Sequence, residues 1–266
     1  MSRIIFYGCG NISQTIIKGL ILDGFAKKNI LYIDRNPLNK KKLSQYGIKY
    51  ADKSKLTTTK NLIILAVKPK DTLAACKEIS AVISAPQLIS LVAGIKIKSL
   101  KKSFSSKASI VRAMPTSAST YKKGITAIYG ERNSEELILN TKKLFSRVGI
   151  SILLQEEVEM NNFTGLIGSG PAYFFYLLKI YNEHLLKLCG GKQRDVDAII
   201  VNFLEGISSS ISDGIDLDMA IDLIASKKGT TEAGINSLND NNVLQLFEKG
   251  IISAINRSKE ISDEYK

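Results

Sequence analysis

An apolar run that leads into a glycine turn gives the first indication of the fold: Ile4-Ile5-Phe6-Tyr7-Gly8-Cys9-Gly10-Asn11-Ile12-Ser13. After the turn, apolar residues recur three or four positions apart, which predicts a helix. A strand, a glycine turn and a helix in this order open a dinucleotide-binding fold. There the second glycine lets the backbone approach a pyrophosphate, which binds free N–H groups at the helix N-terminus. A plain strand-to-helix connection is the alternative interpretation.

The next predicted strand, residues 30–33, ends at two charged residues, Asp34 and Arg35. An acidic residue about twenty positions past the glycine turn is where this fold contacts the adenosine ribose. Asp34 would accept a hydrogen bond from a 2′-hydroxyl and favours NAD, whereas Arg35 could pair with a 2′-phosphate and favours NADP. The two residues point to different cofactors, and a polar loop without a ligand is equally consistent with Asp34.

Strands and helices continue to alternate in the first half of the chain. Apolar runs predict buried strands near residues 61–66, 88–92 and 108–114, and helical spacing predicts helices near 37–46, 69–83 and 134–148. This alternation predicts an α/β fold with a doubly wound, mostly parallel Rossmann-type sheet. Ligands of such sheets bind at the carboxyl ends of the strands.

The pattern changes near residue 156, where helical spacing replaces the β-branched runs. We therefore expect a dinucleotide-binding domain over residues 1–155 and an all-helical domain over residues 156–266. The apolar stripes of the helical part exceed what one small bundle needs, which favours a homodimer or higher homo-oligomer through this domain. Simple packing against the first domain is the alternative.

The charge is divided unevenly between the two halves. Residues 1–150 hold 27 Lys and Arg against 8 Asp and Glu, whereas residues 151–266 hold 10 against 17. The lysines of the basic half stand singly or in short clusters without aromatic residues between them. A solvated lysine-rich surface is favoured over a nucleic-acid interface.

Several protein classes are excluded by what the sequence lacks. Its apolar runs are too short to span a bilayer, and no signal-like segment precedes the first strand, so we expect a cytoplasmic protein without a membrane partner. Cys9, Cys76 and Cys189 are far apart, so neither a disulfide framework nor a zinc site is expected. His184 is the only histidine and is interpreted as structural, and no histidine–carboxylate cluster has metal-ligand spacing. Any redox chemistry would therefore come from a cofactor.

A second informative stretch lies far downstream: Ser226-Lys227-Lys228-Gly229-Thr230-Thr231-Glu232-Ala233. A glycine and two threonines before a helix can form an anion cradle from backbone N–H groups and hydroxyls, which suits a carboxylate. A plain helix N-cap is the alternative, since threonine with a glutamate soon after is common there.

Together, five blocks of this sequence resemble the pyrroline-5-carboxylate reductase family. The blocks are Gly8-Cys9-Gly10-Asn11 with the helix to Leu20, Ala66-Val67-Lys68-Pro69, Arg112-Ala113-Met114-Pro115, Gly165-Leu166-Ile167-Gly168-Ser169-Gly170-Pro171-Ala172-Tyr173, and Ser226 to Thr231. The fourth and fifth blocks are specific to this family. The glycine turn and Val67-Lys68-Pro69 are shared more widely among dehydrogenases with a helical second domain.

The resemblance implies a Rossmann domain, a helical dimerisation domain, and reduction of 1-pyrroline-5-carboxylate to L-proline with NADPH or, less well, NADH. The cofactor-binding residues it implies, together with Arg35, are Gly8, Cys9, Gly10, Asn11, Ile12, Ser13, Ala66, Val67, Lys68 and Pro69. The substrate-binding residues are Ser226, Lys228, Gly229, Thr230 and Thr231. Thr231 would face the ring nitrogen of the substrate and is the catalytic candidate.

Two departures from the family pattern concern the substrate. Thr116-Ser117-Ala118 stands where the family has Asn-Thr-Pro, and Lys227-Lys228 stands where it has Pro-Gly. Both changes affect expected substrate affinity, although Gly229, Thr230 and Thr231 are retained. The alternatives are another imine or 2-hydroxyacid reductase of this architecture and a non-catalytic NADP(H)-binding regulator.

Overall fold

The computed structural model describes residues 3–57 and 61–264. Its chain divides into two compact units, of which the first comprises Met1–Gly168 together with Ala254–Lys266 and the second comprises Ser169–Ser253. This division differs from the domain limits expected at residues 155 and 156. The boundary between the two units lies after Gly168, and the residues from Ala254 onward belong to the first unit.

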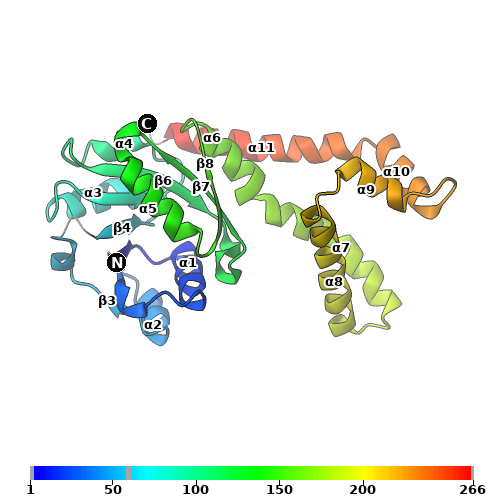
Figure 1. Ribbon diagram of the computed structural model, residues 1–266, viewed down its shortest axis with the longest axis horizontal. Coiled ribbons are helices and arrows are strands. Elements are labelled where there is room, and N and C mark those ends of the chain that lie inside the picture. Colours follow the sequence, from blue (N-terminus) through cyan, green and yellow to red (C-terminus); the bar gives the residue numbers. More distant parts are fainter. Residues whose placement is uncertain (1–2, 58–60, 265–266) are drawn as a thin grey trace. The chain divides into compact units, whose positions relative to one another are not determined.

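The first unit contains an eight-stranded sheet in the order β3-β2-β1-β4-β5-β6-β7-β8 (Figure 1). The strands are β1 (Ile4–Tyr7), β2 (Ile30–Ile33), β3 (Lys49–Tyr50), β4 (Leu62–Leu65), β5 (Gln87–Ser90), β6 (Ser109–Pro115), β7 (Gly124–Gly130) and β8 (Gly149–Leu153). Neighbouring strands are parallel except for β6 and β7, which are antiparallel. The doubly wound, mostly parallel sheet expected from the sequence is confirmed.

Helices cover both faces of this sheet because its strands are apolar on both sides. The helices are α1 (Asn11–Leu22), α2 (Pro37–Gln45), α3 (Thr72–Ser80), α4 (Ile97–Lys101), α5 (Glu135–Phe145) and α6 (Glu159–Phe163). Ile4 and Phe6 of β1 pack into one core with α1, α2 and α5. Ile5 and Tyr7 point the other way, into a core with α3 and α4. Alternation along one strand therefore builds two layers of helices.

The register of the central strands fixes the position of the glycine turn. Tyr7 is paired with Ile33 of β2 and with Leu65 of β4. The residues that directly follow these three strands therefore lie at the same carboxyl edge of the sheet. They are Gly8, Asp34 and Ala66. Doubly wound folds bind their ligands at this edge.

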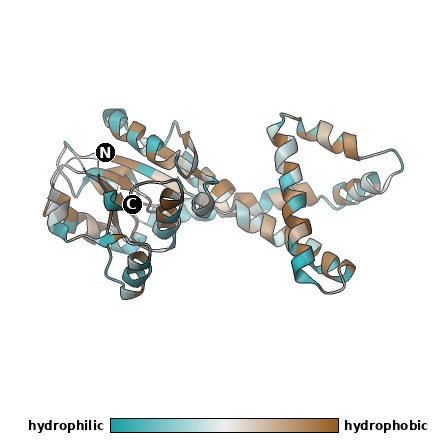
Figure 2. Cartoon of the chain, turned by 60° about the horizontal axis from the view of Figure 1, so that its bottom comes forward, coloured by the Kyte–Doolittle hydropathy of each residue, from teal (hydrophilic) through white to brown (hydrophobic). Residues whose placement is uncertain are grey.

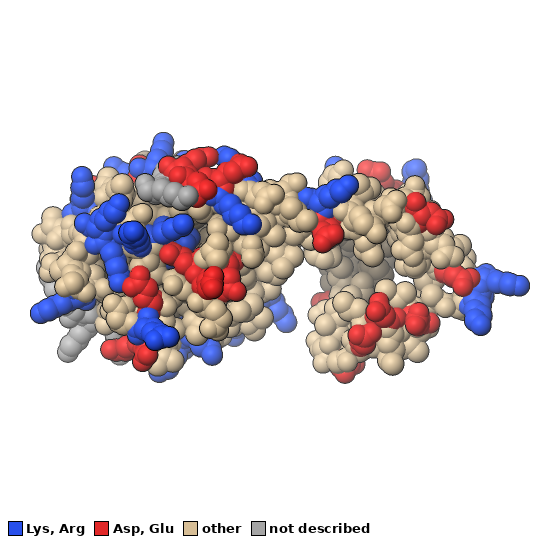
Figure 3. Space-filling view, turned by 90° about the horizontal axis from the view of Figure 1, so that it is seen from above, with Lys and Arg blue, Asp and Glu red and all other residues tan. Residues whose placement is uncertain are grey.

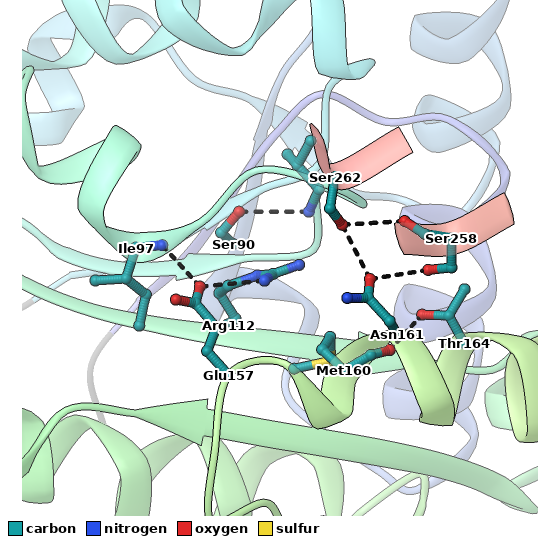
Figure 4. A network of polar contacts seen from close by, with 10 residues as sticks. Ser90, Ile97, Arg112, Glu157, Met160, Asn161, Thr164, Ser258 and Ser262 are labelled. Atoms are coloured by element: carbon teal, nitrogen blue, oxygen red, sulfur yellow. Dashed lines mark hydrogen bonds and ion pairs between the residues drawn. The ribbon is translucent and has the colours of Figure 1, made fainter. Parts of the chain in front are cut away.

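The long helix α11 (Val243–Glu264) belongs to both units, and its last turns pack on the first one. The side-chain oxygen of Asn161 accepts hydrogen bonds from the hydroxyls of Ser258 (3.0 Å) and Ser262 (2.9 Å), as Figure 4 shows. Beside it, Glu157 Oε1 accepts from Arg112 Nη1 (3.1 Å) and from the Ile97 backbone N–H (2.8 Å). The segment around α6 thus ties α11 to the sheet.

The second unit is entirely helical in its described elements, as the sequence predicts. It contains α7 (Gly170–Leu188), α8 (Gln193–Ser212), α9 (Leu217–Ile224), α10 (Thr230–Asp240) and the first part of α11. Pro171 lies in the first turn of α7, where its missing N–H costs no helical hydrogen bond. The rings of Tyr181 and Phe203 stack between α7 and α8, with centroids 5.6 Å apart. Across the described ranges, no helix is both long and apolar enough to cross a bilayer.

Candidate functional site

Gly8 must be glycine for two independent reasons. Its φ angle of +93° lies in the region that only glycine adopts without strain. A Cβ at this position would also lie 2.7 Å from the Ala66 carbonyl oxygen and 2.9 Å from Val67 Cγ1. The first glycine therefore lets the ends of β1 and β4 approach closely, and it brings two of the predicted cofactor-binding blocks together.

Gly10 plays a different part in the same turn. It is the N-cap of α1, no side chain caps this helix, and a Cβ added to Gly10 would have no atom within 4 Å. The space in front of the helix N-terminus is therefore open, and its first N–H groups have no intrahelical partner. Buried Ser13 donates its hydroxyl hydrogen bond to the Gly8 carbonyl oxygen (2.8 Å) and fastens α1 to the turn. This arrangement suits a bound pyrophosphate.

A cleft of about 390 Å³ opens at this edge of the sheet. Of the residues predicted to bind a cofactor, those that line it are Gly8, Cys9, Gly10, Arg35, Ala66, Val67 and Lys68. Asn11, Ile12 and Ser13 belong to the first turn of α1, and Pro69 opens the next helical turn, so these four lie outside its lining. The first unit thus brings together residues separated by more than fifty positions.

Asp34 holds the glycine turn in place. Its Oδ2 accepts hydrogen bonds from the Cys9 backbone N–H (2.6 Å) and from Asn39 Nδ2 (3.1 Å), and its Oδ1 accepts from the Asn36 N–H (2.6 Å). From the sequence, Asp34 could be either a ribose ligand or a residue of a polar loop without a ligand. The structure adds that the carboxylate already has three donors within the protein, so Asp34 supports the turn itself.

We expect Asp34→Ala to lower the free energy of unfolding by about 1–3 kcal/mol, because it leaves the Cys9 N–H without its acceptor. Asp52 is a control, since its carboxylate accepts the N–H of the nearby Ser54 (3.0 Å) in an exposed turn. Denaturant unfolding of both alanine variants measures the difference. Equal losses in the two variants would contradict the role assigned to Asp34.

Cys9 has no reactive character in this turn. Burial, followed by the neighbouring Asp34 carboxylate, raises the pKa of the Cys9 thiol, so the thiol stays protonated at neutral pH. Cys9, Cys76 and Cys189 are all free cysteines. Within the described ranges, no group of three or more His, Cys, Asp or Glu residues is arranged to hold a metal ion. Neither thiol nor metal chemistry is therefore assigned to this cleft.

One wall of the cleft carries a contact that sequence analysis missed. Glu78 of α3 accepts an ion-paired hydrogen bond from Lys53 Nζ (2.8 Å) and a second hydrogen bond from the Tyr7 hydroxyl. The hydrogen bonds from Lys53 and then Tyr7 hold the pKa of Glu78 below its usual value. Burial and then Glu78 raise the pKa of Tyr7, so Tyr7 remains the donor. Isolated charged residues in an amphipathic helix give no sequence signal for such a contact.

The predicted substrate loop lies in the second unit, between α9 and α10. The Gly229 N–H donates to the Ser226 carbonyl oxygen (2.9 Å), which closes a four-residue turn, and Thr230 begins α10. No side chain caps the first turn of α10, so N–H groups at its start can bind an anion. That this loop holds the substrate carboxylate stays a prediction.

The two departures from the family pattern have local explanations. Lys228 adopts φ +58° and donates its N–H to Glu232 Oε2 (2.6 Å), so the left-handed turn forms although lysine replaces glycine. Buried Thr116 accepts a hydrogen bond from the Ile125 N–H on its hydroxyl (3.0 Å) and joins the end of β6 to β7. Lys228 and Thr116 each take part in a hydrogen bond that holds the local backbone.

Known proteins match this chain in both units. A family model described as NADP oxidoreductase coenzyme F420-dependent matches residues 3–94, and one described as pyrroline-5-carboxylate reductase dimerisation matches residues 157–261. Pyrroline-5-carboxylate reductase 1 of Bacillus spizizenii is 32% identical over 270 residues, covering 98% of this chain and 90% of that protein. This chain belongs to the pyrroline-5-carboxylate reductase family.

Other members of the reductase family agree over the same length. Pyrroline-5-carboxylate reductase 2 of Bacillus subtilis is 29% identical and covers 100% of this chain and 96% of that protein. The solved structure of a pyrroline-5-carboxylate reductase from Coxiella burnetii superposes with a TM-score of 0.85 at 26% identity, covering 98% of both chains. The expected family and fold are therefore confirmed.

The cofactor cleft of this reductase-family chain fits a phosphorylated dinucleotide. The missing side chain of Gly10 leaves room at the N-terminus of α1. Arg35, Lys40, Lys53 and Lys68 line the same cleft and supply positive charge. More widely, Figure 3 shows basic side chains interspersed with acidic ones on the visible face of the first unit.

Proposed function

We propose that this chain reduces 1-pyrroline-5-carboxylate to L-proline, the last step of proline biosynthesis, with NADPH as the preferred donor and NADH as a possible one. The observation that carries the proposal is the glycine-turn cleft at the sheet edge, in a chain with full-length relatives named pyrroline-5-carboxylate reductase. The Gly229-Thr230-Thr231 start of α10 supports the substrate assignment, because a helix N-terminus suits a carboxylate.

A bound nicotinamide supplies the hydride that reduces C5 of the cyclic imine. The chain's own contribution is position, since a protonated C=N is electrophilic and the reacting carbons mainly have to be aligned. In this proposal the N–H groups at the start of α1 hold the pyrophosphate, and Ser226, Lys228, Gly229 and Thr230 hold the substrate carboxylate. Thr231 donates a hydrogen bond to the ring nitrogen and orients it for protonation, directly or through water.

An oxidation assay with 1-pyrroline-5-carboxylate tests the proposal. We expect substrate-dependent oxidation of NADPH, followed at the nicotinamide absorbance, with L-proline as the measured product. A parallel panel of other cyclic imines and 2-oxoacids separates this activity from another reductase of the same architecture. Binding of NADPH without turnover of any substrate would contradict the proposal and favour a regulator.

Arg35 is expected to favour the phosphorylated cofactor. Arg35→Ala should weaken NADPH binding about ten-fold, because a charge-assisted contact to the 2′-phosphate is lost, while NADH binding changes less than about two-fold. Titration calorimetry with both cofactors measures the two dissociation constants. Arg132→Ala is a control, since Arg132 lies in a short helical turn outside the cleft lining. Equal weakening of NADPH and NADH would argue against the contact.

We also propose that the chain forms a homodimer or higher homo-oligomer through its helical unit. The match to a dimerisation model over residues 157–261 supports this, as do the many apolar residues along these helices in Figure 2. Phe174, Phe175 and Leu244 are examples, with 61%, 69% and 73% of their surface exposed. Light scattering coupled to size-exclusion chromatography gives the oligomer mass, and a monomer at micromolar concentration would contradict the proposal.

We propose that this chain is located in the cytoplasm. Its free cysteines suit a reducing compartment, because cytosolic thiols are kept reduced. Cell fractionation followed by immunodetection tests the location, and recovery in a membrane or secreted fraction would contradict it.

A further inference from the structure

We propose that Glu78 sets the preference of the cofactor cleft between NADPH and NADH, by keeping a negative charge beside the cations that face the 2′-phosphate. The inference rests on the proposed function, since it concerns the same cofactor. Glu78 lies on α3, so this control of cofactor preference comes from outside the glycine turn and the strand ends.

The first support is position. Glu78 reaches the cleft from α3, Tyr7 reaches it from the end of β1, and Lys53 reaches it from the turn after β3. Arg35 and Lys40 line the same cleft. The side chains of Lys53 and Glu78 remain 49% and 40% exposed, so both can interact with a ligand that enters.

The second support is the balance of charge. Asp34 has three N–H donors from the glycine turn and α2, so its charge is compensated locally. Lys53 is paired with Glu78 at 2.8 Å. Arg35 and Lys40 form no ion pair with any described residue. Glu78 therefore compensates the charge of Lys53, one of the three cations at this end of the cleft. Arg35 and Lys40 remain to attract an anion.

The chemical difference between the two cofactors isolates this effect. NADPH carries a 2′-phosphate with a charge of about −1.5 to −2 at neutral pH, and NADH has a hydroxyl in its place. A change of charge beside this position therefore acts on NADPH and leaves NADH nearly unaffected. The Glu78 carboxylate repels the phosphate and also holds Lys53 away from it.

Glu78→Gln removes the charge and keeps the shape of the side chain. Its amide oxygen can still accept from Tyr7, while Lys53 is released. Because one screened charge near a protein surface is worth up to about 1 kcal/mol, we expect NADPH to bind about three- to five-fold more tightly, with NADH within about two-fold of its original affinity. Lys53→Gln leaves Glu78 unpaired and should weaken NADPH by a similar factor. The double variant should return close to the original ratio.

Calorimetric titration of NADPH and NADH into the full chain measures all four proteins without any substrate. Glu131→Gln is the matched control, because Glu131 is 41% exposed and paired with Lys101 at 2.5 Å, yet lies outside the cleft lining. Its ratio of the two dissociation constants should not change. Thermal unfolding of each variant confirms that it is folded.

An unchanged ratio in Glu78→Gln, or a loss of NADPH affinity in that variant, would overturn the inference. The second result would mean that Glu78 serves by holding Lys53 in place for the phosphate. These outcomes are separable from failure of the proposed function. That failure appears as absence of 1-pyrroline-5-carboxylate reduction by the unaltered protein, whatever the ratio of cofactor affinities.

Discussion

Thr231→Ala is expected to lower kcat/KM for 1-pyrroline-5-carboxylate by about 100-fold, at the low end of what a positioned proton donor contributes. The hydroxyl is proposed to hold the ring nitrogen at the start of α10, so its loss leaves the imine bound by its carboxylate alone. NADPH binding should stay close to normal, because the glycine turn and its cleft lie in the first unit.

Two companion measurements make this prediction specific. Thr231→Ser keeps the hydroxyl and should retain most of the activity. Thermal unfolding of Thr231→Ala should be nearly unchanged, since the side chain caps no helix: α10 has no side-chain cap. Normal turnover by the alanine variant would remove Thr231 from the proposed mechanism, whereas a large fall in unfolding temperature would show a structural role.

The second large effect is expected at Gly8. Gly8→Ala should lower the free energy of unfolding by about 3 kcal/mol or more, which is the range of strained backbone combined with overpacking. An alanine here would have φ near +93° and its Cβ 2.7 Å from the Ala66 carbonyl oxygen. Denaturant unfolding measures the loss, and a stable Gly8→Ala protein would contradict the close approach of β1 and β4.

Gly10→Ala separates folding from binding in the same turn. Its Cβ would enter open space, and its φ of −67° suits alanine, so stability should hardly change. NADPH affinity should fall about ten-fold or more, because the methyl group would occupy the approach of the pyrophosphate to the N-terminus of α1. Normal NADPH affinity in a folded Gly10→Ala variant would remove the pyrophosphate from this position.

Much of the fold follows from short-range patterns. The run Ile4 to Tyr7 and the spacing of Ile12, Ile16 and Leu20 predict β1 and α1 within a few residues of their observed limits. Pro37 and Pro69 mark the starts of helical segments that the structure confirms. These features depend on backbone propensity and on burial of one face, and both can be inferred from residues that are close in the sequence.

Other features depend on contacts between distant residues and left no local signal. Asp34 was noticed for its spacing from the glycine turn, but its bonds to Cys9 and Asn39 needed the folded sheet. Glu78 and Lys53 looked like ordinary surface charges until the structure placed them on one wall of the cleft. The division of α11 between two units is equally hidden, because its helical spacing runs without interruption across residue 253.

That division also bears on the order in which the chain can fold during synthesis. Domains generally fold from the N-terminus as the ribosome releases them. Here Ser258 and Ser262, whose hydroxyls donate hydrogen bonds to Asn161, are translated only after the whole helical unit. The nascent nucleotide-binding unit therefore lacks the C-terminal part of α11, and one of its surfaces stays uncovered, while about eighty-five further residues are translated.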